Sequence, residues 1–186
     1  IFEDISIAFE DSDQDPPGTQ ASAIKMYTES GGTEITDADD DSSSWTNDDQ
    51  PYFSWTNGED AVDGTNLYYC VYLGTSSSAD PRSSKGLLGT TQESTTGTDC
   101  NGFITTSNSL DLSTASNRGS TWLDDSGSYY LVVTAMDTSG NAKGEPFTSF
   151  HFQFDDTPPT NPSGLSAPQT YQANVENITV YWSTSG

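Results

Sequence analysis

The chain has 186 residues, in which 28 acidic side chains outnumber 5 lysines and arginines and give a formal net charge of -23. This charge argues against nucleic acid as a partner, because phosphate binding needs lysine and arginine to replace counterions, and it disfavours anionic membrane surfaces. Aromatic residues make up 11% of the chain, which is too many for a compositionally disordered protein, and no run of 18 apolar residues could span a membrane.

Alternation of apolar and polar residues with a period of two recurs along the chain, and Gly, Asn, Asp, Ser and Pro separate the alternating segments. This pattern predicts strands over residues 23–28, 51–56, 67–74, 87–91, 102–105, 109–112, 128–136 and 147–155. No segment shows sustained helical periodicity. We therefore expect an all-β fold, either a sandwich or a barrel.

The chain also repeats itself. The segment from Phe9 to Pro17 is similar to the segment from Phe154 to Pro159, since each has a phenylalanine, an acidic run and then Pro-Pro. Such similarity indicates tandem domains joined by stiff linkers. We expect residues 1–15 to end a preceding repeat or form a linker strand, residues 16–156 to form a whole domain, and residues 157–186 to begin the next. The chain would then be a piece of a longer array.

Several motifs together resemble a known family. The alternating segment 129–135 resembles the F strand of fibronectin type III and related bacterial or archaeal surface-protein repeats, Trp55 matches the B strand, and residues 69–71 match the C strand. Residues 137–141 resemble the F–G turn, and residues 156–162 resemble an interdomain linker. The resemblance implies an immunoglobulin/fibronectin III-like β-sandwich in a tandem repeat, which spaces, presents or adheres.

The chain has two cysteines, Cys70 and Cys100. They are compatible with one disulfide in an oxidising compartment, and the alternative is a pair of free, partly buried thiols. A disulfide would fit an extracellular or cell-surface protein. No cofactor is required by any motif in the sequence.

The acidic residues are the sharpest chemical signal in the sequence. In a fibronectin-like topology many of them fall at the two ends of the domain, where carboxylates repel unless they are neutralised. Oxygen ligands of this kind suit Ca²⁺, so one hypothesis is calcium bound at the domain junctions. The alternative is a diffuse acidic surface solvated by water and salt. The candidate ligands are Asp13, Asp15, Asp60, Asp63, Asp124, Asp125, Asp137, Asp155 and Asp156.

Nothing in the sequence indicates an enzyme. The one histidine, His151, falls inside a predicted strand, and the chain lacks a nucleophile elbow, a phosphate loop and HExxH or CxxC motifs. Trp45 and Trp122 could stack against a sugar or cover one end of a sandwich. Asn177 lies in the one N-x-S/T sequon, a possible glycosylation site.

We therefore expect a structural repeat of an extracellular fibre, stalk, S-layer-like or adhesin protein that acts as a semi-rigid spacer. Its partners would be neighbouring repeats or identical subunits. Residues 1–15 or 157–186 would give a second mode of assembly if they add a strand to a neighbouring subunit. The alternative function is a module that binds carbohydrate or protein, for which an exposed aromatic cluster is the expected mark.

Overall fold

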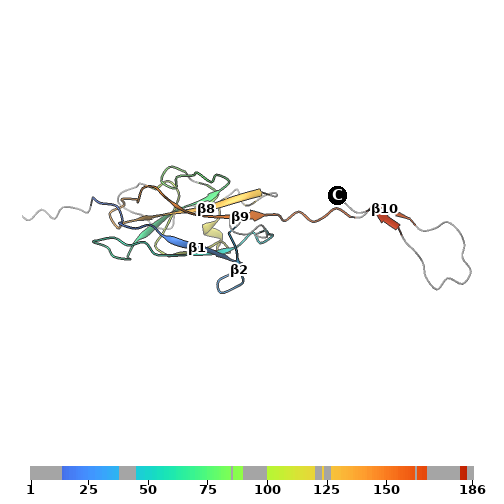
Figure 1. Cartoon of the computed structure of the whole chain (residues 1–186), viewed down its shortest axis with the longest axis horizontal. Coiled ribbons are helices and arrows are strands. Elements are labelled where there is room, and N and C mark those ends of the chain that lie inside the picture. Colours follow the sequence, from blue (N-terminus) through green and yellow to red (C-terminus); the bar gives the residue numbers. More distant parts are fainter. Residues whose placement is uncertain are drawn as a thin grey trace, which may run out of the picture. The chain divides into compact units, whose positions relative to one another are not determined.

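A computed structural model describes most of the chain (Figure 1). The described residues are 14–37, 45–84, 86–89, 100–119, 123, 127–161, 163–166 and 181–183. The chain divides into two compact units, residues 1–156 and residues 157–186. The first unit holds both large sheets. In the second unit, β10 (Ser163–Ser166) and β11 (Tyr181–Ser183) pair as an antiparallel two-stranded sheet.

The first unit contains two sheets. The smaller has the order β2-β1-β4-β7, and the larger has the order β3-β9-β8-β5-β6. The strands of the smaller sheet are β1 (Ser22–Tyr27), β2 (Glu34–Ile35), β4 (Tyr52–Thr56) and β7 (Ser109–Asp111). The strands of the larger sheet are β3 (Trp45–Thr46), β5 (Tyr68–Gly74), β6 (Phe103–Thr105), β8 (Gly127–Met136) and β9 (Thr148–Phe154). A single 3-10 turn, η1 (Ala115–Asn117), is the one helical element among the described residues, so the all-β prediction is confirmed.

One hydrophobic core joins the two sheets. The smaller sheet contributes Phe53 and Trp55, which alternate along β4 as the sequence predicts, and both are buried. The rings of Phe150 and Phe152 on β9 lie 6.1 and 5.8 Å from the Phe53 ring, between ring centroids. Because β-strand side chains alternate, these residues project from facing sheets into the same layer.

The outer face of the larger sheet is also partly covered, which explains why β5 is buried on both sides. Tyr72 and Val132 pack there against Ala79, which belongs to the long segment after β5. A second outer cluster contains Ile104, Met136 and Ala142. The long segment after β5 therefore covers part of the second face of the larger sheet.

Two parts of the strand prediction differ from the structure. The expected strand over residues 87–91 is wrong for its described part, because Leu88 makes only an isolated bridge to Arg118. Backbone approaches closely here, and a Cβ on Gly89 would lie 2.5 Å from the Ser116 carbonyl oxygen. The two-residue strands β2 and β3 were not predicted, since two residues are too short to show a period.

The terminal strands β1 and β9 run in the same direction. Thr148 at the start of β9 donates a hydrogen bond from Oγ1 to the carbonyl of Ala21, just before β1, and Ile24 lines the same groove as Phe150 farther along both strands. The chain therefore enters the first unit where β1 begins, here called the incoming end, and leaves where β9 ends, here called the outgoing end. In Figure 1, β9 points toward the right of this unit.

Candidate functional site

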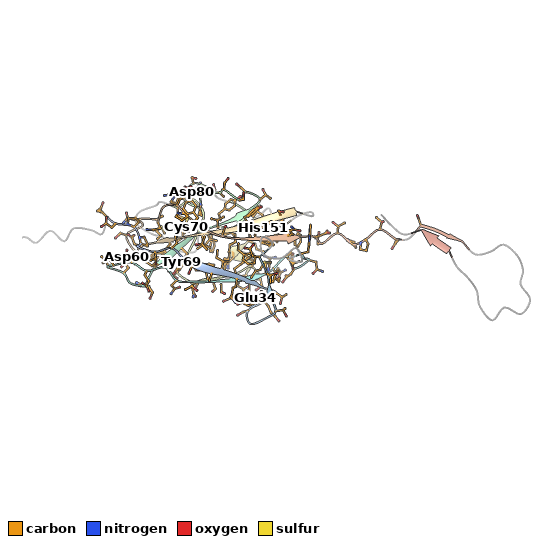
Figure 2. The ribbon with its side chains drawn as sticks, viewed as in Figure 1. Glu34, Asp60, Tyr69, Cys70, Asp80 and His151 are labelled. Carbon is orange, nitrogen blue, oxygen red and sulfur yellow. A yellow bond between two sulfur atoms is a disulfide. The ribbon has the colours of Figure 1, made fainter. Side chains whose placement is uncertain are left out.

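The loops at the incoming end hold three of the predicted calcium ligands. In the loop after β4, Asp60 Oδ1 accepts hydrogen bonds from the backbone N–H groups of Val62 at 2.7 Å and Asp63 at 3.0 Å. The bond from Asp63, followed by the bond from Val62, holds the pKa of the Asp60 carboxyl below its ordinary value. Gly64 closes this turn with a φ of 62°, in the left-handed region that glycine favours. Asp60 is labelled in Figure 2.

Asp63 and Asp137 tie this loop to the turn after β8. The carboxylate of Asp63 accepts hydrogen bonds from Thr138, at 2.9 Å from the backbone nitrogen and 2.9 Å from Oγ1. Asp137 is fully buried and accepts bonds from the Asn141 backbone nitrogen at 2.8 Å and from Asn141 Nδ2 at 2.7 Å. N–H and O–H donors of the chain thus neutralise part of the charge on both carboxylates, and the two loops form one connected end of the domain.

Three more of the predicted ligands lie among the described residues. Asp15, Asp155 and Asp156 are exposed, and the backbone nitrogen of Asp155 donates a hydrogen bond to the Thr46 carbonyl at 3.0 Å. The other predicted ligands, Asp13, Asp124 and Asp125, lie outside the described residues, as does the sequon residue Asn177. Within the part of the chain that the structure describes, no three His, Cys, Asp or Glu side chains are grouped as metal ligands.

A hollow of about 520 Å³ lies next to the residues that follow β1, precede β4 and end β7. The sequence pattern did not predict that these residues come together. The carboxylates of the hollow are those of Glu29, Asp48, Asp49 and Asp111. Asp48 Oδ1 accepts a hydrogen bond from the Gln50 backbone nitrogen at 2.9 Å, so this carboxylate also caps a turn. The pairing of β4 with β7, which places Asp111 opposite Tyr52, is the signal that would have brought Asp111 to this end.

Cys70 and Cys100 form a disulfide, with their Cα atoms 5.7 Å apart and 30 positions apart in the chain. The disulfide joins the middle of β5 to Cys100, which lies shortly before the start of β6. Beside it, Arg82 binds Asp80 at 2.8 Å and holds the pKa of the Asp80 carboxyl below its ordinary value. The Arg82 guanidinium also lies 5.2 Å from the centre of the Phe147 ring. The disulfide and this ion pair fix the cover over the larger sheet.

Among the residues whose side chains the structure describes, one indole is exposed. Trp45 on β3, an edge strand, is 52% exposed, whereas Trp55 is buried and Trp122 lies outside the described residues. His151 lies on β9, as its sequence position predicts. Its ring stacks on that of Tyr130 with centroids 4.5 Å apart and planes 9° apart.

The side chain of Gln20 is a tie between the sheets that sequence reasoning missed. Gln20 lies just before β1, and its Oε1 accepts a hydrogen bond from the Ala135 backbone nitrogen on β8 at 2.9 Å. Its Nε2 donates to the Gly144 carbonyl and to Thr134 Oγ1, both at 3.0 Å. An isolated glutamine carries no sequence signal for such a role, because its partners are more than 110 positions away.

Comparison with known proteins gives no family assignment: no family, curated protein or solved structure matches the chain. No helix in the described part of the chain is long and apolar enough to cross a membrane. A functional proposal therefore depends on two features of the structure. These are the hydrogen bonds between the loops at the incoming end and the parallel course of β1 and β9.

Proposed function

We propose that this chain is a structural repeat module of an extracellular fibre, stalk, S-layer-like or adhesin protein, and that it acts as a semi-rigid spacer. The observation that carries the proposal is the parallel course of β1 and β9, which lets the chain enter the module at one end and leave it at the other. Modules connected in this way extend a chain in series.

The strand order supports an immunoglobulin/fibronectin III-like sandwich. The order β1-β4-β7 corresponds to strands A-B-E of that fold, and β9-β8-β5-β6 corresponds to strands G-F-C-C′. Residues 16–156 would then be one complete repeat. Residues 1–15 would belong to the preceding repeat or linker, and residues 157–186 would begin the next.

The terminal strands are paired so that an extending force would shear them. β9 pairs with β8 over seven residue pairs, and β3 pairs with its last two residues. Because β9 would be pulled along its own axis toward the outgoing end, its ladder hydrogen bonds would carry the load together. At the incoming end, the Thr19 backbone nitrogen donates a hydrogen bond to the Glu59 carbonyl oxygen at 3.0 Å. The Glu59 backbone nitrogen donates a second one to Thr19 Oγ1 at 2.8 Å.

Two further features fit an extracellular location. The Cys70–Cys100 disulfide is suited to an oxidising compartment. A net charge of -23 keeps a surface polymer soluble where salt screens its self-repulsion.

Force spectroscopy on a polyprotein of this chain tests the spacer proposal. We expect the first unit to unfold in one step at a higher force when it is pulled through residues 16 and 156 than when it is pulled across β8 and β9 in an unzipping geometry. Reduction of the disulfide should lengthen that step by about 100 Å, because 30 positions at about 3.5 Å each are released. Equal forces in the two geometries would reject the spacer role.

The exposed Trp45 favours a second candidate, a module that binds carbohydrate or protein. In that case Trp45→Ala should abolish retention of the chain on an immobilised glycan or protein panel while the melting midpoint is kept. The same panel should not distinguish Trp45→Ala from the unmodified chain if the module is only a spacer.

A further inference from the structure

An apolar groove of about 430 Å³ opens between β1 and β9, and we call it the β1–β9 groove. Ile24 and Ile35 line it from the smaller sheet, and Phe150 lines it from the larger sheet. Both isoleucines are partly exposed and pack against the main core, so the groove leads directly to that core. Lys25 and Glu34 form an ion pair of 3.0 Å at its rim.

The groove exists because the chain changes sheets after β2. Among the described residues, β1 pairs with β2 only through Met26 and Tyr27. After β2 the chain turns away from β1 toward β9. Asp37 Oδ2 there accepts a hydrogen bond from the His151 backbone nitrogen on β9 at 3.1 Å. Within the described part of the chain, no strand pairs with Ser22–Lys25 on this side, and Phe150 lines the groove where the two sheets meet.

The first part of β1 offers what an added strand needs. On the side of β2, the described residues leave Ser22–Lys25 without a paired strand, although the other side of β1 pairs with β4. An incoming strand could take main-chain hydrogen bonds from this edge and place alternate side chains on the apolar floor.

Residues 5–9 of the chain have the pattern that such a strand requires. In the sequence Ile-Ser-Ile-Ala-Phe, the alternation places Ile5, Ile7 and Phe9 on one face of a strand about 17 Å long. Proline is absent from the chain before Pro16, so the main-chain donors of this strand are complete. Acidic residues flank the segment on both sides, and Lys25 is a cation at the groove rim.

We propose that the β1–β9 groove is a receiving site for residues 5–9 of a second copy of this chain, which add as a strand beside β1. The inference rests on the proposed function, since copies arranged in series bring the segment of one module to the groove of the next. Ile7 is the central apolar side chain of the added strand, and Ile24 is its counterpart in the groove.

Complementation between two variants of the full chain tests the site. Ile7→Asp removes the inserted face and keeps the groove, whereas Ile24→Asp alters the groove and keeps the segment. We expect the unmodified chain to self-associate in sedimentation velocity and each variant alone to dissociate about a hundredfold more readily, which corresponds to the loss of one buried isoleucine and the burial of a charge. An equimolar mixture should form a heterodimer. Val62→Asp, at a side chain that is 74% exposed elsewhere, is the matched control and should associate normally.

A peptide of residues 1–13 provides a second measurement that does not depend on the fold of the Ile24 variant. The labelled peptide should bind full-length Ile7→Asp saturably, and a peptide with aspartate at positions 5 and 7 should not bind. Association that is unchanged in both variants would overturn the proposal. A monomeric unmodified chain whose stability both substitutions lower would also overturn it, because that result would mean that residues 5–9 occupy the groove of their own chain. Filaments that persist in both variants under electron microscopy would reject this site and leave the spacer function standing.

Discussion

The tie made by Gln20 gives the sharpest prediction for the stability of the fold. Gln20→Ala removes the acceptor of the Ala135 backbone N–H, which is buried and would lose its partner. A buried donor left unpaired costs about 1–3 kcal/mol. Two further hydrogen bonds, to Gly144 and Thr134, are lost with it. We therefore expect the free energy of unfolding to fall by about 2–3 kcal/mol.

Equilibrium urea unfolding of the full chain measures this loss. With a slope of about 2 kcal/mol per molar urea, the midpoint should fall by about 1 M. Gln50→Ala is the matched control, because Gln50 is exposed and only its backbone nitrogen makes a described hydrogen bond. The control should change the free energy by less than about 0.5 kcal/mol.

A double-mutant cycle separates the network from simple truncation. Thr134 Oγ1 donates to the Lys143 carbonyl at 2.7 Å and accepts from Gln20, so the two side chains share one hydrogen-bonded unit. The double variant Gln20→Ala with Thr134→Val should lose at least about 0.5 kcal/mol less than the sum of the single losses. A Gln20→Ala midpoint equal to that of the Gln50 control would refute the reasoning.

The remaining predictions concern the disulfide, the bulge, one tyrosine and calcium. Replacing Cys70 and Cys100 with alanine should lower the free energy of unfolding by about 3–4 kcal/mol, as expected for a 30-residue loop and measured in urea. Ala23 has a φ of 48° at an exposed position, so Ala23→Gly should raise that free energy by about 0.5–1 kcal/mol, and a loss would contradict it. Burial raises the pKa of Tyr69 above its ordinary 10.0, so the folded state keeps its proton to a higher pH than the unfolded state does. Stability should therefore fall as the pH rises above 10, and urea midpoints at pH 9 and 11 should differ less in Tyr69→Phe. The calcium hypothesis predicts a higher melting midpoint in CaCl₂ than in EDTA at fixed ionic strength, and identical midpoints would reject it.

The sequence predicts the long strands well because their alternation is strong. Phe53 and Trp55 on β4, and Leu131 and Val133 on β8, fill the core face that their period-two pattern indicates. The short strands β2 and β3 escape prediction, since their pairing depends on partners far along the chain. Local pattern thus predicts which residues are buried, and long-range pairing decides how the edges are completed.

The candidate site shows a different limit of sequence reasoning. Acidic residues in loops predict carboxylates at the domain ends, but not what each carboxylate binds. Asp60 caps its own loop, Asp63 reaches the turn after β8, and Asp137 is buried inside that turn. A hydrogen bond from N–H or O–H to a carboxylate and coordination of a cation draw on the same oxygens. The one-dimensional pattern is therefore identical for the two roles.

The distribution of these bonds bears on how a strongly acidic module stays folded. Like charges at one end repel, and each carboxylate that accepts main-chain N–H bonds has its charge offset by fixed dipoles. Asp60 and Asp63 gain this offset from loops after β4 and β8, so the same bonds that relieve repulsion also fasten the incoming end. The loops at this end are thus held together by hydrogen bonds within the chain. The calcium hypothesis then places the ion between modules, where the exposed carboxylates of Asp15 and Asp156 would meet those of a neighbouring repeat.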